Sequence, residues 1–205
     1  SALTTAQAAS LSTTFVGTLT TAHVVALTTT ALSLISRVSL QSLTTSSISA
    51  ITTAQVPALT PLQIAYGLAT KQVAALTTDQ VINLSTDQVA TLTTRQLTSL
   101  TTAQTVALTT DQLAALTTAQ VASLSEANLA KITTDQITSL TTNQMAGLTT
   151  AQVVDLTTAQ IATLTTDQLS SLTSLQVAKM ETEDLAAITT DQITGLKTAQ
   201  IAALT

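Results

Sequence analysis

The chain has 205 residues, of which 45% are apolar, 8% charged and 1% aromatic, and its formal net charge is −5. This balance argues against a nucleic-acid partner, which needs clustered Lys and Arg, and the absence of Cys excludes disulfides and thiolate metal sites. No apolar run reaches the ~18 residues of a membrane span.

One octapeptide is repeated 25 times from Leu3 onward. The first frame runs from Leu3 to Tyr66, one extra residue near Gly67 shifts it, and the second frame begins at Leu68. Position one is Leu, Ile or Met throughout, position two is Thr or Ser in 22 copies, position five is Gln in 18, and position six is aliphatic in 23. A short fixed period is typical of a solenoid, in which each unit packs on its neighbours.

Each octad has the pattern of a helix start, as in Leu76-Thr77-Thr78-Asp79-Gln80-Val81. Thr at position two is the expected N-cap, and Gln at position five completes a capping box with it. The apolar residues at positions one and six then form a hydrophobic staple. Pro61 at position three agrees with this register, because Pro is favoured in the first turn of a helix. Acids also favour the first turn, and positions three and four hold Asp79, Asp87, Asp111, Glu126, Asp135, Asp167, Glu183 and Asp191.

Because a new helix starts every eight residues, the previous one must already have ended. One continuous helix is excluded, since its Leu stripe would spiral around the surface. We therefore predict an all-α solenoid of 25 repeats, each a short capped helix plus a corner, with two or three octads per coil. Asp87, Asp111 and Asp135 recur at 24-residue intervals, which favours three. The alternative is a β-solenoid, which Thr and Val favour, although its corners usually need more glycine than the four present.

Along the chain we expect residues 1–66 to form divergent N-terminal repeats or a cap, and 67–205 a regular solenoid. In the first part, position five is Phe15, His23, Ala31, Ser39 and Ser47 in place of Gln. Pro57 is expected to break a second helical turn, and the extra residue near Tyr66-Gly67 to cause a bulge or kink. The pattern stops at Leu204-Thr205 with no polar cap, which favours end-to-end stacking or continuation in a longer chain.

The sequence predicts no catalytic, cofactor-binding or metal site. His23 replaces a capping Gln and is interpreted as structural, and the scattered acids complement helix dipoles and do not converge on calcium. Glu181-Thr182-Glu183-Asp184, the one acidic cluster, leaves a weak cation site open. A row of second Thr residues leaves ice binding open. The remaining basic residues are interpreted as solubility charges, and they are Lys71, Arg95, Lys131, Lys179 and Lys197.

Octads such as Leu148-Thr149-Thr150-Ala151-Gln152-Val153-Val154 resemble the LTTxQ-type octapeptide repeats of very large secreted bacterial surface proteins of the adhesin and RTX kind. The resemblance covers nearly the whole chain and implies an extracellular, structural or adhesive role. The glycine-rich calcium-binding nonapeptide of RTX proteins is absent. Leu59-Thr60-Pro61-Leu62-Gln63-Ile64-Ala65 resembles the first helix of TAL-effector repeats, but the base-reading loop is missing.

These observations predict a non-enzymatic structural repeat protein without a cofactor. We expect a filament subunit or a stalk or spacer of a bacterial surface or extracellular assembly. The expected partner is another copy of the chain, end to end or laterally, with other cell-surface components possible in addition. The alternative is a binding module, an adhesin-like face for a glycan or for ice.

Overall fold

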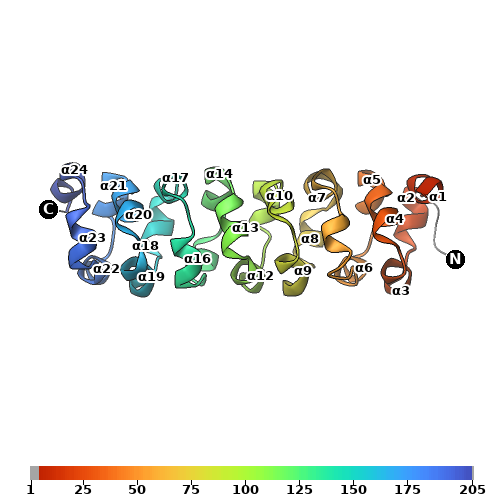
Figure 1. Cartoon of the computed structure of the whole chain (residues 1–205), viewed down its shortest axis with the longest axis horizontal. Coiled ribbons are helices and arrows are strands. Elements are labelled where there is room, and N and C mark those ends of the chain that lie inside the picture. Colours follow the sequence, from red (N-terminus) through yellow and green to blue (C-terminus); the bar gives the residue numbers. More distant parts are fainter. Residues whose placement is uncertain (1–4, 205) are drawn as a thin grey trace. The chain divides into compact units, whose positions relative to one another are not determined.

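A computed structural model describes residues 5–204, and its only regular elements there are helices, one for each octad (Figure 1). The chain divides into two compact units, residues 1–108 and 109–205. The first unit contains α1 (Thr5–Ala9), α2 (Thr13–Gly17), α3 (Thr21–Val25), α4 (Thr29–Leu34), α5 (Arg37–Leu40), α6 (Thr45–Ser49), the 3-10 helix η1 (Val56–Ala58), α7 (Pro61–Gly67), α8 (Thr70–Val73), α9 (Thr78–Ile82), α10 (Thr86–Ala90), α11 (Thr94–Leu97) and α12 (Thr102–Ala107).

The second unit contains α13 (Thr110–Ala115), α14 (Thr118–Ala122), α15 (Glu126–Leu129), α16 (Thr134–Thr138), α17 (Thr142–Ala146), α18 (Thr150–Val154), α19 (Thr158–Thr163), α20 (Thr166–Ser171), α21 (Ser174–Ala178), α22 (Thr182–Ala187), α23 (Thr190–Thr194) and α24 (Thr198–Ala202). The all-α repeat solenoid predicted from the octads is confirmed, and the part of the chain that the structure describes contains no strand.

The predicted capping box begins most of the helices. In α17 the N-cap Thr141 has extended backbone (φ −69°, ψ 158°), and its hydroxyl accepts the Gln144 amide at 3.2 Å. The Gln144 Oε1 accepts the Thr141 amide at 2.7 Å. Two of the N–H groups that a helix start leaves unpaired are thereby satisfied. Position two is therefore the N-cap and position three the first helical residue, as the sequence predicted.

Each helix ends without a left-handed residue. Among the described residues none has positive φ, so the corners make no demand for glycine. The last turn tightens instead: the Leu148 amide donates to the Met145 carbonyl at 3.2 Å, and the Gly147 amide donates to the Gln144 carbonyl at 3.2 Å. The chain then becomes extended and reaches the next N-cap two residues later. This is how four glycines suffice for 25 octads.

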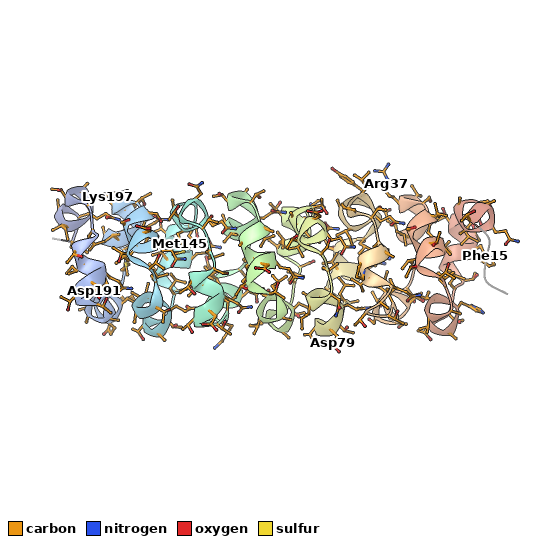
Figure 2. All side chains as sticks on the ribbon, in the orientation of Figure 1. Phe15, Arg37, Asp79, Met145, Asp191 and Lys197 are labelled. Carbon is orange, nitrogen blue, oxygen red and sulfur yellow. The ribbon has the colours of Figure 1, made fainter. Side chains whose placement is uncertain are left out.

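The core is a layer of aliphatic side chains from positions one and six. Position six is buried in each described octad through Val177, and position one is almost as fully buried. Met145 is 0% exposed and lies well inside the second unit (Figure 2). The staple pair of each octad therefore points inward, and Leu, Val and Ile fill a narrow core that requires no aromatic residue.

Three octads make one coil in each unit. In the first unit α2 packs on α5 and α5 on α7, and these helices follow one another along one side (Figure 1). In the second unit α14 packs on α17 and α17 on α20. Each helix thus lies on the helix three octads earlier. The 24-residue interval of the Asp residues indicated this coil length correctly.

The Gln at position five also joins one coil to the next. The Gln144 Nε2 donates to the Leu113 carbonyl at 2.9 Å and to the Leu116 carbonyl at 2.6 Å, in the preceding coil. These two carbonyls belong to the end of α13 and the corner after it, where a helix lacks acceptor partners. One buried amide thus caps its own helix at the N-terminus and another helix at the C-terminus. We call this arrangement the glutamine clamp.

The divergent N-terminal octads keep a weaker form of the clamp. The Ser39 hydroxyl donates to the Leu11 carbonyl at 3.2 Å, and the Ser47 hydroxyl donates to the Leu19 carbonyl at 2.9 Å. Each Ser therefore retains one bond between coils where Gln makes two. Ala31 has no side-chain donor, and only its amide is capped, by the Thr28 hydroxyl at 3.1 Å.

The two irregular octads differ in how they depart from the pattern. Pro57 lies in the 3-10 helix η1, which agrees with the prediction that it would prevent a second helical turn. The extra residue causes no bulge with unusual backbone, contrary to our expectation. It is absorbed into α7, the longest helix at seven residues, whose last residue is Gly67. A helix can gain one residue without strain, because each added peptide continues the same hydrogen-bond pattern.

Replacement of Gln144 by Ala should destabilise the second unit by about 3 kcal/mol, because it leaves the Thr141 amide and two carbonyls without their partner. Urea denaturation followed by circular dichroism measures this change, and hydrogen exchange locates it. The control is Asn143→Ala at the exposed neighbouring position, expected within about 0.5 kcal/mol of the parent. Equal stability of the two variants would refute the clamp.

Gly147→Ala tests the spacing of the coils. A Cβ at residue 147 would lie 1.9 Å from the Thr118 Cγ2 in the preceding coil. We expect a loss of about 1 kcal/mol from this overpacking, although Ala otherwise favours a helical backbone. Thr118→Ser removes the opposing methyl group and should restore the stability of the Gly147→Ala chain in a double-mutant cycle. Additive effects of the two changes would show that the coils are not in contact here.

Candidate functional site

His23 has a structural role in α3. Its Nδ1 accepts the amide of the N-cap Thr20 at 3.3 Å, and its own amide donates to the Thr20 hydroxyl at 3.4 Å. The ring thus takes the place of the capping Gln, as the sequence predicted. In the neutral ring the proton then resides on Nε2, the atom that corresponds to the donor of a Gln side chain.

Most of the acids lie where the helix dipole favours them, although Asp155 is the C-cap of α18. Asp79, Asp111 and Asp191 stand in the first turns of α9, α13 and α23 and are exposed. Asp191 lies at the edge of the second unit in Figure 2. Across residues 5–204, no three His, Cys, Asp or Glu side chains are grouped so that they could hold a metal ion. The Asp residues are therefore spread over separate helix starts.

The acidic cluster at 181–184 places one carboxyl in the clamp position. Asp184 occupies position five of its octad and is only 3% exposed. Glu181 is the N-cap of α22 and makes no side-chain capping bond. Burial raises the pKa of the Asp184 carboxyl above its usual range, and the charges of Glu181 and Glu183 raise it further. This octad therefore carries a buried acid where its neighbours carry an amide that donates two hydrogen bonds.

The second Thr of each pair is exposed in most octads, as Thr78, Thr94 and Thr110 illustrate. Its position at the first helical residue leaves its side chain outside the capping box. These Thr residues recur on successive coils, so they remain available as a regular polar surface.

An apolar strip on the first unit escaped the sequence analysis. Val38, Leu62 and Tyr66 are 66, 57 and 58% exposed and belong to α5 and α7, which pack against each other. The Arg37 guanidinium lies 5.8 Å from the centre of the Tyr66 ring, a cation–π distance. Arg37 projects outward in Figure 2. The signal in the sequence was Val38 and Leu62 at position four, where most other octads have a small or polar residue, together with Tyr66 at position eight.

The last coil, formed by α22, α23 and α24, is less buried than the others. At position six Ile193 and Ile201 are 50 and 45% exposed, whereas the corresponding side chains of the described earlier coils are buried. The first coil, formed by α1, α2 and α3, has Phe15 50% exposed at position five. Within residues 5–204 no helix is long and apolar enough to cross a membrane.

Asp184→Gln should restore the clamp and stabilise the chain at pH 7 by about 1–2 kcal/mol. The pKa of the Asp184 carboxyl is higher in the folded chain than in the unfolded chain. This group therefore weakens folding as pH rises between these two pKa values, and acid relieves the penalty. The advantage of the variant should shrink on acidification. Denaturation at several pH values measures this, with Asp191→Gln, at an exposed position, as the control; an equal effect of both changes would contradict it.

A family model described as the ALTTAQ repeat matches the chain at residues 67–94, 81–118, 92–126, 110–142, 142–174 and 177–205. Its six letters correspond to octad positions eight and one to five, so they span the corner, the N-cap and the clamp. No curated protein matches the chain. Because the matches cover more than half of the sequence, the chain belongs to the ALTTAQ repeat family.

Proposed function

We propose that the chain is a structural segment of a bacterial surface or extracellular assembly, a filament subunit or stalk, and not an enzyme. The observation that carries this proposal is the glutamine clamp. The polar side chain that recurs most regularly in the core makes hydrogen bonds within its own coil and to the preceding one. A repeat in which the Gln side chains bond to the backbone of their own coil and of the preceding coil supports the stacking of similar coils. This role requires no substrate.

The extracellular setting rests on two features of the sequence. The chain has no Cys, and its octads resemble those of large secreted bacterial surface proteins. We take the low charged fraction of 8% and the many Thr and Ser residues as further support for an extracellular setting.

End-to-end contact is the association that the coil geometry favours. Ile193 and Ile201 of the last coil are exposed where a further coil would cover them. The clamp side chains reach toward the preceding coil. Position five of the first coil, with Phe15 and His23, therefore faces the N-terminal end, whereas Ile193 and Ile201 face the C-terminal end. We propose that the first coil of a second copy packs on the last coil of the first. This contact continues the interface that already joins coil to coil within each unit.

Ile201→Glu tests this contact, because a buried charge at the interface is costly, whereas the side chain is half exposed in the single chain. We expect the parent chain to associate with increasing concentration in analytical ultracentrifugation and to form uniform fibres in electron microscopy, and Ile201→Glu to abolish both. Leu175→Glu is the matched control on α21, because Leu175 is 62% exposed and occupies position four, outside the apolar layer of positions one and six. A parent chain that stays monomeric at all concentrations, or equal effects of the two changes, would reject the end-to-end contact.

A further inference from the structure

A cavity of about 270 Å³ opens in the first unit beside the inserted residue. Ala65 of α7 and the following Leu68 and Ala69 supply its apolar wall, and Thr70, Thr93 and Arg95 supply polar atoms from α8 and the start of α11. The extra residue of α7 immediately precedes this wall. The cavity therefore lies at the one place where the octad frame shifts.

The octad at the cavity lacks the usual cap. Ala69 stands at position two, where 22 octads have Thr or Ser, and it is the only exception without a polar side chain. The Gln72 Oε1 still accepts the Ala69 amide at 2.8 Å, but no hydroxyl caps the Gln72 amide. Loss of such a cap costs about 1 kcal/mol. The smaller side chain leaves room where a Thr would extend.

The charged residues at position four are basic in the two octads that contain Lys71 and Arg95 and acidic in the others. Lys71 and Arg95 both occupy position four, 24 residues apart, and their helices α8 and α11 pack on each other. The acids of this unit, Asp79 and Asp87, belong to the two octads between Lys71 and Arg95 and thus lie on the other two sides of the coil. Two cations therefore share this side of the first unit, and Arg95 is the one that lines the cavity.

The remaining polar groups at the cavity are already engaged. The Gln96 Nε2 donates to the Ile64 carbonyl at 2.8 Å and to the Leu68 carbonyl at 2.7 Å, and the Thr93 hydroxyl donates to the Gln96 Oε1 at 3.0 Å. Recognition of a ligand thus falls to the Arg95 guanidinium and the Thr70 hydroxyl. A guanidinium binds a carboxylate through two parallel hydrogen bonds.

We propose that this cavity binds one carboxylate-bearing sugar, such as a uronic acid, with the carboxylate on Arg95. The apolar wall suits the C–H face of a pyranose ring, and the pocket is open to solvent, so that the rest of a sugar can extend outward from it. The Thr70 hydroxyl can bond a ring hydroxyl, and the charge of Lys71 on the packed helix α8 adds longer-range attraction for an anion. This binding activity is separate from the structural role and would attach the chain to an acidic polysaccharide or to a free sugar acid.

Titration of the full ¹⁵N-labelled chain by NMR tests the site with glucuronate, glucose, acetate and an oligoglucuronate. We expect glucuronate to shift the amides of residues 68–72 and 93–96, glucose to leave them unchanged, and acetate to bind at least tenfold more weakly. Tighter binding of the oligomer than of glucuronate identifies a polysaccharide unit as the ligand, and binding of the monomer alone identifies a free sugar acid. Equal affinity for acetate and glucuronate, or no shift with either sugar acid, would overturn the proposal.

Two substitutions separate binding from folding. Arg95→Ala should weaken glucuronate binding at least tenfold, whereas Lys131→Ala, the loss of an exposed cation in the other unit, should leave it unchanged. Ala69→Thr should raise the melting temperature by restoring the cap and yet weaken binding by filling the cavity. Unaltered affinity in both Arg95→Ala and Ala69→Thr would refute the site.

Discussion

The structure depends on one side-chain amide used in two directions. The Gln at position five accepts the N-cap amide of its own octad through Oε1 and donates through Nε2 to two carbonyls of the coil before it. Helices of four to seven residues are too short to be stable alone, since their end groups are nearly all of their backbone groups. The clamp satisfies both kinds of end group, and the aliphatic side chains of positions one and six then exclude water from it.

This arrangement explains which positions vary and which do not. Positions one, two, five and six contribute to the core or the clamp; the residue types of positions one, two and six hardly change, and position five is Gln in 18 octads. Position eight faces the coil before it, and in two octads the space there is so small that Gly147 and Gly195 each lie against a Thr methyl group. Positions three and four are mostly exposed and carry nearly all of the acids. Stability and surface chemistry are thus assigned to different positions of the same octad.

The structural role and the proposed sugar site arise from different parts of this pattern. The proposed association uses the apolar layer, because Ile193 and Ile201 of the last coil are exposed at position six, which is buried in the earlier described octads through Val177. A binding site requires a departure from the repeat, since otherwise every coil would carry it. The inserted residue, Ala69 at an N-cap and the pair of cations at position four coincide on one side of two successive coils of the first unit. That coincidence is the reason for assigning recognition to this region.

The octad register, the helix starts, the inward-facing positions and the structural role of His23 could all be predicted from the sequence. These features depend on residues within eight positions of each other, where capping and helical periodicity are local rules. The match to the ALTTAQ repeat supports the prediction of a repeat-protein family. The 3-10 conformation at Pro57 was also predictable in kind, because the missing amide hydrogen is a property of the residue itself.

Only the tertiary structure decided what meets across the coils. The second role of Gln and the single bonds of Ser39 and Ser47 involve partners that are 28 to 32 residues apart. The burial of Asp184 and the cavity beside Arg95 depend on how successive coils stack. Which residues meet at that distance depends on the angle by which the chain changes direction at each corner. Small differences in this angle, summed over the corners of a coil, decide whether a coil contains two octads or three. A local pattern sets each corner's residues but not that sum, so the contacts between coils follow from the packing of the whole unit.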